Sequence, residues 1–234
     1  MPWPCANLSE AELVSWIQHR ISDQSHVLSR GYQGHIYLFE GKGCRLIIKV
    51  ASGSGLLRAL RTMMLRKEYK IYTRLKGFRG SPRCYGLLQG RYLVLEYIEA
   101  VSLRHAEIED RDTFFQNLLD RIIELHRLGI VHFDLKRKDN LLVADKRFPC
   151  LIDFGTAVAR KLGFAPINHY LYNLGEKFDF NAWIKLKYDG KMENISAADR
   201  IYYQRTRLEK TARWVKRLYK KIRFSQYFPG KTGP

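Results

Sequence analysis

The amino-acid sequence predicts an α+β fold with two lobes, a small antiparallel sheet with one helix and then a mainly helical part. Segments rich in β-branched and aromatic residues gather in the first hundred positions, apart from the strongest helical pattern, which covers residues 112–128. Strands and helices segregated along the chain in this way are typical of α+β folds. A chain of 234 residues is long enough for one domain or for two small lobes that share a cleft.

A short amphipathic helix is expected within residues 1–25. Ser9 and Glu12 have the spacing of a capping box, in which the two residues satisfy each other's backbone N–H groups at a helix start. Apolar residues then recur at helical spacing, and they are Leu13, Trp16, Ile17 and Ile21.

Four strands and a second helix are predicted next. The strands have the β-branched and aromatic composition of a pleated sheet and cover residues 35–39, 45–50, 84–88 and 92–97. Gly41 and Gly43 separate the first two strands and favour a hairpin turn. Residues 58–76 return to helical character, so we expect one helix between the second and third strands.

The later part is expected to be mostly helical. Residues 112–128 carry one apolar face, and Gly129 suits the end of that helix. Two short strands are expected around residues 141–143 and 150–152. Residues 160–195 contain several glycines and a proline, and we expect them to be less regular.

Charge is the unusual feature of the composition. Lysine and arginine total 41 against 23 acidic residues, which gives a formal net charge of +18. Such a field attracts anionic partners: nucleic acid, an anionic membrane face or phosphorylated glycans. Hydrophobic residues make up 46% and charged residues 27%, so extensive disorder is not expected.

The four cysteines are widely spaced and contain no CxxC pair. We therefore expect neither a zinc cluster nor a disulfide framework, and reduced thiols are the simplest interpretation. The first residues do not have the pattern of a signal peptide, and no apolar run approaches the roughly 18 residues that span a bilayer. A cytoplasmic protein is the expectation, with attachment to a membrane surface left open.

Two motifs carry the densest chemical signal. Residues 130–142 read IVHFDLKRKDNLL, and residues 151–155 read LIDFG. Here the sequence resembles the protein-kinase-like superfamily, with its H-R-D-L-K-x-x-N catalytic loop and D-F-G metal motif. Both motifs occur in the family's order, each after a short apolar strand. The resemblance implies a bilobal protein-kinase-like fold that uses ATP and Mg²⁺.

The resemblance also implies a role for each charged residue of these motifs. Asp134 would orient the acceptor hydroxyl and accept its proton, and Lys136 would neutralise the γ-phosphoryl group. Asp153 would bind Mg²⁺ that bridges the phosphates, and Asn140 would bind a second Mg²⁺.

Four further elements are similar to the nucleotide site of this family: a lysine, a glutamate, a glycine-rich cover and a hinge. Lys49, in the segment IIKVA, would hold the inner phosphates, and Glu68 is the one acidic residue between Lys49 and Glu96 that could pair with it.

The nucleotide cover and the hinge complete the resemblance. Gly31 and Gly34 match two of the three glycines that cover the phosphates, and Ile36 fits the apolar position that packs on adenine. The backbone of Glu96 and Ile98 resembles the hinge that hydrogen-bonds adenine.

The sequence departs from the family pattern in the catalytic loop. Phe133 replaces the arginine that usually pairs with a phosphate on the activation loop, which makes activation by phosphorylation of that loop doubtful. Asn140 lies six residues after Asp134 where the usual spacing is five, so Asp139 is an alternative metal ligand. The sequence that follows Asn140, Leu-Leu, favours Asn140.

A further departure lies downstream. Only 79 residues follow Gly155, and Ala165–Pro166 is followed by isoleucine rather than by the glutamate of an A-P-E motif. The second lobe is therefore expected to be shortened, as in compact bacterial members such as lipopolysaccharide-core heptose and Kdo kinases and RIO-type kinases.

The resemblance suggests four parts of the chain. They are an N-terminal helix (1–25), an N-lobe (26–98), a C-lobe (99–198) and a basic helix and tail (199–234). Residues 199–223 hold ten basic and two acidic residues with one apolar stripe. This segment fits either a helix docked on its own lobe or one lying on an anionic membrane, such as the cytoplasmic face of an inner membrane.

Three functions are therefore considered. The first is an ATP-dependent kinase whose acceptor is a hydroxyl of a lipopolysaccharide-core sugar, an anionic or lipid-linked glycan. The second is a Ser/Thr protein kinase, favoured by Lys136, and the third is a pseudokinase that binds nucleotide or an anionic surface. No zinc finger, helix-turn-helix or RNA-binding signature is present, so nucleic acid is not an expected partner.

Overall fold

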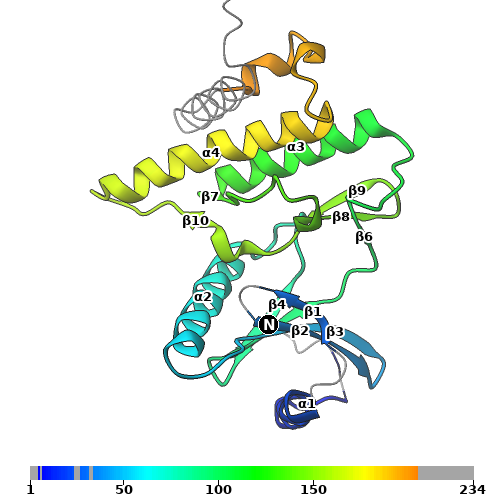
Figure 1. Ribbon diagram of the computed structural model, residues 1–234, viewed down its shortest axis with the longest axis vertical. Helices are drawn as coiled ribbons and strands as arrows, with labels where there is room; N and C mark the ends of the chain where they lie inside the picture. Colours follow the sequence, from blue (N-terminus) through cyan, green and yellow to red (C-terminus); the bar gives the residue numbers. More distant parts are fainter. Residues whose placement is uncertain (1–4, 6, 24–26, 32–33, 205–234) are drawn as a thin grey trace, which may run out of the picture.

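The computed structural model describes residues 5, 7–23, 27–31 and 34–204, and it confirms the α+β fold. A sheet with a helix on its outer face forms one end of the molecule, and two long helices lie side by side in the other part (Figure 1). The first part contains α1 (Glu10–Asp23), β1 (Val27–Gly31), β2 (Gly34–Gly41), β3 (Cys44–Val50), α2 (Gly55–Arg74), β4 (Cys84–Leu88) and β5 (Tyr92–Glu96).

The second part is organised around helices and short hairpins. Its helices are α3 (Arg111–Arg127) and α4 (Pro166–Lys187), and its strands are β6 (Val101–Ser102), β7 (Ile130–Val131), β8 (Leu141–Ala144), β9 (Phe148–Leu151) and β10 (Val158–Ala159). Short 3-10 helices occur at Lys138–Asn140, Phe154–Thr156, Met192–Asn194 and Asp199–Tyr202.

The sheet of the first part is antiparallel, with the order β1-β2-β3-β5-β4. Side chains alternate across β3 because successive residues of a strand point to opposite faces. Leu46 and Ile48 are buried against α1, whereas Ile47 and Lys49 point to the other face, toward the rest of the protein. The strand pattern in the sequence thus fixes the direction of Lys49.

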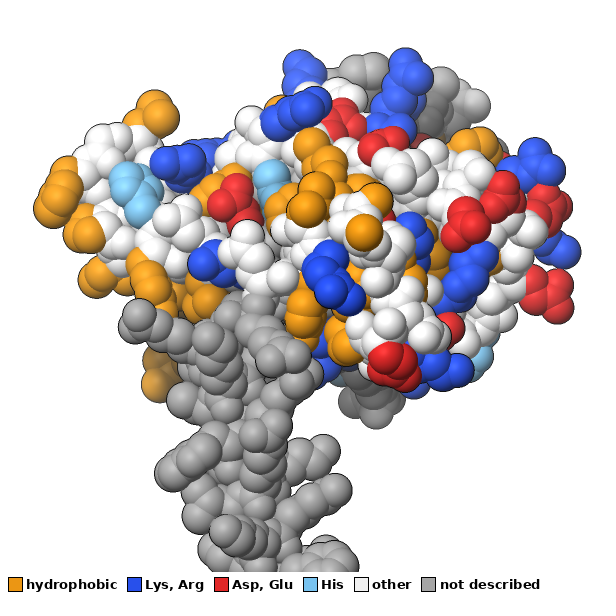
Figure 2. Space-filling model, turned by 90° about the horizontal axis from the view of Figure 1, so that it is seen from above, with side chains coloured by type: hydrophobic (Ala, Val, Ile, Leu, Met, Phe, Trp, Pro, Cys, Tyr) orange, Lys and Arg blue, Asp and Glu red, His pale blue; other side chains and the backbone are white. Residues whose placement is uncertain are grey.

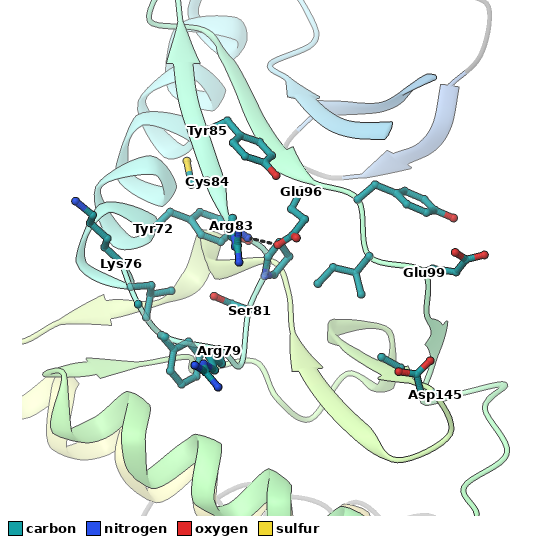
Figure 3. Close-up of a pocket in the computed structure, with 17 residues that line it drawn as sticks. Tyr72, Lys76, Arg79, Ser81, Arg83, Cys84, Tyr85, Glu96, Glu99 and Asp145 are labelled. Atoms are coloured by element: carbon teal, nitrogen blue, oxygen red, sulfur yellow. Dashed lines mark hydrogen bonds between the residues drawn. The ribbon is translucent and has the colours of Figure 1, made fainter. Parts of the chain in front are cut away.

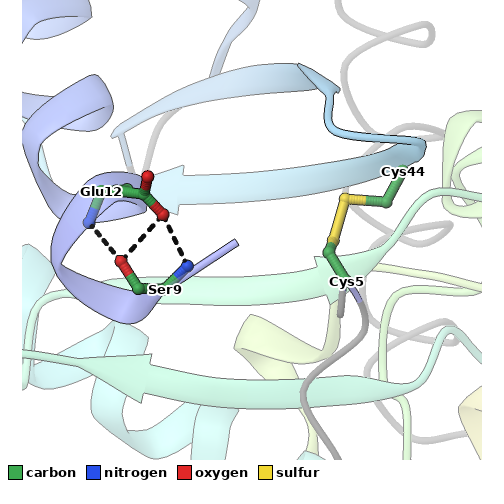
Figure 4. Close-up of a disulfide and its surroundings, with 4 residues drawn as sticks. All are labelled: Cys5, Ser9, Glu12 and Cys44. Atoms are coloured by element: carbon green, nitrogen blue, oxygen red, sulfur yellow. Dashed lines mark hydrogen bonds between the residues drawn. A yellow bond between two sulfur atoms is a disulfide. The ribbon is translucent and has the colours of Figure 1, made fainter. Parts of the chain in front are cut away.

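The capping box at the start of α1 is confirmed. The Ser9 N–H donates to Glu12 Oε2 over 2.8 Å, and the Glu12 N–H donates to Ser9 Oγ over 3.2 Å (Figure 4). The apolar face of α1 packs on the outer face of the sheet, where Leu13 and Ile17 are fully buried beside Tyr37.

The expectation of four reduced thiols is wrong for one pair. Cys5 and Cys44 form a disulfide between the segment before α1 and the start of β3 (Figure 4), with Cα atoms 6.0 Å apart. The packing of α1 on the sheet brings together two residues separated by 39 positions. Cys84 and Cys150 are free and buried, as expected.

The expectation of an irregular segment over residues 160–195 is also wrong, because α4 is a helix of 22 residues. Pro166 occupies its first turn, where a proline is tolerated because the first N–H groups have no helical partner. Gly175 lies in its middle, and a Cβ there would meet Val131 Cγ2 at 2.4 Å. The glycine therefore allows α4 to approach β7 closely rather than breaking the helix.

The other strong patterns agree with the structure. α3 buries the predicted face against the main core, including Phe115, Leu118 and Ile122. Within the residues described, no helix is long and apolar enough to cross a membrane. Most of the predicted basic helix, from residue 205 on, lies outside the described residues.

Candidate active site

Lys49, Glu68 and Asp153 meet between the two parts of the molecule. Lys49 Nζ donates to Glu68 Oε1 over 2.6 Å and to Asp153 Oδ1 over 3.2 Å. Lys49 comes from β3, Glu68 from the middle of α2, and Asp153 from the loop after β9. Three elements from distant parts of the sequence thus place one ammonium group between two carboxylates.

Burial and neighbouring charges shift the pKa values of Lys49 and Asp153 in opposite directions. Burial disfavours the ammonium form of Lys49, but attraction to Glu68 and Asp153 outweighs it and raises the pKa of Lys49. Burial likewise favours the neutral acid of Asp153, yet the charge of Lys49 lowers the pKa of Asp153 below its usual value. At neutral pH the cluster therefore holds a charged lysine and an ionised Asp153.

Asp134 and Asn140 lie together on the catalytic loop. Asn140 Nδ2 donates to the backbone oxygen of Asp134 over 2.9 Å and to its carboxylate Oδ2 over 3.2 Å. The backbone N–H of Ile152 donates to the Asn140 carbonyl over 3.0 Å, which joins this loop to the residue just before Asp153. The two motifs recognised in the sequence thus form one connected network.

A buried carboxylate that the sequence analysis missed holds the catalytic loop. Asp179, on α4, is fully buried and accepts the backbone N–H groups of His132 and Phe133 over 2.7 and 2.8 Å. It also contacts His126 Nε2 at 3.0 Å. Phe133 has a φ of 74°, a strained conformation for a bulky residue, and the bond from its N–H to Asp179 stabilises it.

One sequence signal could have revealed Asp179. It is an acidic residue four positions from both Gly175 and Trp183, and all three lie on the buried face of α4. A carboxylate on an apolar helix face needs specific partners, because an unpaired buried charge is costly.

Position 133 also has a packing role. The Phe133 ring lies edge-on to Phe178, with ring centroids 5.3 Å apart. The phenylalanine thus packs against α4 at the position where the family pattern has an arginine.

The two candidates for the second metal ligand have different surroundings. Asp139 forms a bidentate ion pair with Arg104, with N···O distances of 2.9 and 2.8 Å. Asn140 is buried, and its amide N–H₂ group donates to Asp134, so its side-chain oxygen is the atom available to a cation. These contacts favour Asn140 over Asp139.

Basic side chains flank Asp134. Lys136 is exposed two residues further along the loop. Arg137 Nη1 lies 3.9 Å from Asp134 Oδ2, a neighbour that the sequence analysis missed. An acceptor that reaches Asp134 thus enters a cationic surrounding.

A cavity of about 300 Å³ adjoins the lysine cluster and is lined by Lys49 and Asp153. The other lining residues are mostly apolar and include Leu28, Ile47, Leu95, Leu142 and Ile152, none of which the sequence analysis singled out. Charged groups at one end and apolar walls at the other suit a nucleotide, with its phosphates at Lys49 and its base between the aliphatic side chains.

The predicted hinge residues line the same cavity. The Glu96 N–H donates to the Arg83 carbonyl over 2.9 Å, so the Glu96 carbonyl is its remaining backbone group for a base. Ile98 follows on the cavity wall.

The predicted glycine cover is described in part. Gly31 pairs with Gly34 at the ends of β1 and β2, and residues 32–33 between them lie outside the described part of the chain. A Cβ at Gly34 would lie 2.0 Å from the Val50 carbonyl oxygen, so close approach of β2 to β3 requires glycine there. Ile36 pairs with Lys49 across the two strands and is not among the residues that line the cavity.

A larger cavity, of about 1170 Å³, lies next to the residues after β5 (Figure 3). It shares Tyr72, Glu96 and Ile98 with the smaller cavity but is lined by neither Lys49 nor Asp153. The smaller cavity, which contains the charged cluster, is therefore the candidate site for a nucleotide.

Tyr72 connects α2 to the motif at Asp153. Its ring lies edge-on to Phe154 at 5.3 Å, and Phe154 in turn contacts His132 at 4.8 Å. This stack of rings ties the helix that carries Glu68 to both catalytic motifs.

The donor atoms at the site fit Mg²⁺. Asp153 supplies a carboxylate whose side chain is 37% exposed, and Asn140 supplies an amide oxygen. Oxygen donors of this kind are the ligands that Mg²⁺ prefers in proteins.

The comparisons with known proteins find local similarity to serine/threonine-protein kinases. The chain is 37% identical over 76 residues to a probable serine/threonine-protein kinase of Bifidobacterium longum, 39% over 75 residues to serine/threonine-protein kinase D of Synechocystis, and 37% over 97 residues to testis-specific serine/threonine-protein kinase 5 of Mus musculus. These matches cover 29%, 31% and 39% of this chain.

The matches cover only part of this chain and only part of each relative. They span 10%, 15% and 26% of the length of the three relatives. No family model matches the chain. The local similarity to Ser/Thr kinases, together with the α+β fold, supports a protein-kinase-like protein with a kinase-like function.

Proposed function

We propose that this protein transfers the γ-phosphoryl group of ATP to a hydroxyl group. The observation that carries the proposal is the ion-pair cluster of Lys49, Glu68 and Asp153, bridged to Asp134 and Asn140 through the catalytic loop. Phosphoryl transfer needs positioning and charge neutralisation more than covalent chemistry, and this cluster supplies both.

Each residue has a stated role in the proposal. Glu68 orients Lys49 toward the inner phosphates, and Asp134 positions the acceptor hydroxyl and accepts its proton. Asn140 holds the Asp134 carboxylate through its amide. Asp153 and Asn140 would hold Mg²⁺, which when bound neutralises the phosphate oxygens.

The first candidate acceptor is an anionic sugar, with the lipopolysaccharide core as the specific prediction. Lys136 and Arg137 beside Asp134, and the net charge of +18, favour an anionic acceptor. Residues 156–165, which join the metal motif to α4, form a short connection that contains one two-residue strand.

A Ser/Thr protein substrate is the second candidate, because all the relatives reported above bear that description. The test offers labelled ATP with core lipopolysaccharide and with a generic basic protein in parallel, and Asp134→Asn as the control. Label on the glycan supports the first acceptor, and label on the protein supports the second. Binding of Mg-ATP with no transfer to either acceptor would point to another acceptor or to a pseudokinase.

A cytoplasmic location and membrane contact through residues 199–223 stay predictions. Membrane contact is tested by co-sedimentation with anionic vesicles, in which the full chain is compared with a variant that lacks residues 205–234. Equal sedimentation of the two proteins would exclude the tail as the anchor.

A further inference from the structure

The segment between β10 and α4, together with the first turns of α4, presents a cluster of exposed apolar side chains that the proposed catalysis does not use. Leu162 and Phe164 are 100% and 97% exposed, and Ile167 and Tyr170 are 78% and 65% exposed. Figure 2 shows hydrophobic side chains gathered at the projecting end of the molecule where α4 begins. We call residues 160–171 the apolar tip.

The tip is held in place by its own hydrogen bonds. Asn168 bridges its base, because its Nδ2 donates to the Ala159 carbonyl over 3.0 Å and its Oδ1 accepts the Lys161 N–H over 2.7 Å. His169 Nε2 contacts the Lys161 carbonyl at 2.9 Å. The loop thus presents Leu162 and Phe164 outward although neither contributes to the core.

Three basic residues lie at the base of the tip, and we call them the cationic collar. Arg160 and Lys161 belong to it and are exposed, and Arg74 Nη1 at the end of α2 reaches the Arg160 carbonyl over 3.4 Å. The sequence contains no acidic residue between Asp153 and Glu176. Apolar side chains at the end of a cationic collar match the two layers of an anionic bilayer, its apolar interior and its charged headgroups.

Two other partners fit the apolar tip less well than an anionic membrane does. A second copy placed symmetrically on the tip would bring Arg160 and Lys161 of both chains together, and like charges repel. The chain's own residues 205–223 hold nine basic residues and one acidic residue, so they are repelled by the same collar.

We propose that the apolar tip inserts into the surface of an anionic membrane, with Leu162, Phe164 and Ile167 among the acyl chains and Arg160 and Lys161 at the headgroups. The tip begins seven residues after Asp153 on the same segment of chain. Insertion therefore brings the segment that follows Asp153 to the membrane surface. The proposal concerns binding and does not depend on phosphoryl transfer.

The test is co-sedimentation of the full chain with phosphatidylglycerol-containing vesicles and with pure phosphatidylcholine vesicles. We expect the triple variant Leu162→Ser, Phe164→Ser and Ile167→Ser to bind the anionic vesicles at least tenfold more weakly than the wild type. We expect Arg160→Gln and Lys161→Gln each to weaken binding by about fivefold, and less at high salt.

A matched control removes three other exposed apolar side chains, Leu56, Leu57 and Leu60 on α2, by substitution with serine. This variant should bind like the wild type. Unchanged binding by the tip variant would overturn the proposal, and so would equal losses in both variants. A smaller oligomer of the tip variant, with vesicle binding intact, would also overturn it in favour of a second copy.

An environment-sensitive fluorophore on Phe164→Cys gives an independent measurement, because the two free native cysteines are buried. Its emission should shift to the blue when phosphatidylglycerol vesicles are added. Emission that does not change with vesicles would contradict insertion of the tip.

Discussion

Asp179→Asn tests whether α4 holds the catalytic loop. The substitution keeps the shape of the side chain but replaces one carboxylate oxygen by an N–H₂ group, which donates and cannot accept. Asp179 accepts backbone bonds on both oxygens, from His132 on Oδ2 and from Phe133 on Oδ1. Either orientation of the amide therefore loses at least one of these bonds.

The magnitude follows from those contacts. A hydrogen bond to a charged group contributes about 1.5–3 kcal/mol, and the bonds that remain become neutral and weaker. Where the amide nitrogen faces Phe133, the lost acceptor also releases the strained backbone of that residue. We expect the free energy of unfolding to fall by about 2–5 kcal/mol. We also expect slower phosphoryl transfer, because Asp134 follows Phe133 directly and moves with it.

Urea denaturation of the wild type and the variant measures this difference. Asp120→Asn is the control, because Asp120 is exposed on α3 and accepts one bond from Gln116. The control should stay within about 0.5 kcal/mol of the wild type. A similarly small change for Asp179→Asn would refute the argument that this carboxylate stabilises the loop.

Three further predictions concern the sheet and its covering helix. Unfolding without reductant should expose two reactive thiols and unfolding with reductant four; four thiols without reductant would exclude the disulfide. Gly34→Ala should lower the unfolding temperature because its Cβ would meet the Val50 carbonyl oxygen, and an unchanged melting curve would contradict that contact. The hydrogen bond from Lys42 and those from Ser9 lower the pKa of Glu12 to about 2, so its contribution to stability is present above its ordinary pKa of 4.5 and is lost as the pH falls toward 2. Glu12→Gln should remove that pH dependence, and an NMR titration that gives an ordinary pKa would contradict it.

Local patterns predicted the elements whose signals are contained in neighbouring residues. The capping box of Ser9 and Glu12 marks the start of α1, and the alternation in β3 turns Lys49 away from that helix. The two catalytic motifs were identified because each combines a short apolar strand with charged residues at a fixed spacing. The contact between Lys49 and Glu68 followed because no other acidic residue was available on that helix.

Features that depend on tertiary packing were not predicted. Pro166 and Gly175 were interpreted as signs of irregular structure, because a sequence does not show that a glycine enables close packing against Val131. The disulfide depends on how α1 docks on the sheet. The apolar wall of the proposed nucleotide cavity contains residues such as Leu28 and Leu142, which no pattern distinguishes from other strand residues.

The most direct test of the proposed function compares the wild type with Asp134→Asn in two assays on the same preparation, binding of Mg-ATP and transfer of its γ-phosphoryl group. The proposal predicts similar binding by both proteins, because Lys49 and the cavity walls are untouched, and transfer that falls by about 10²–10⁴-fold. Equal rates of transfer would contradict the role of Asp134. Failure of the wild type to bind Mg-ATP would contradict the nucleotide site itself.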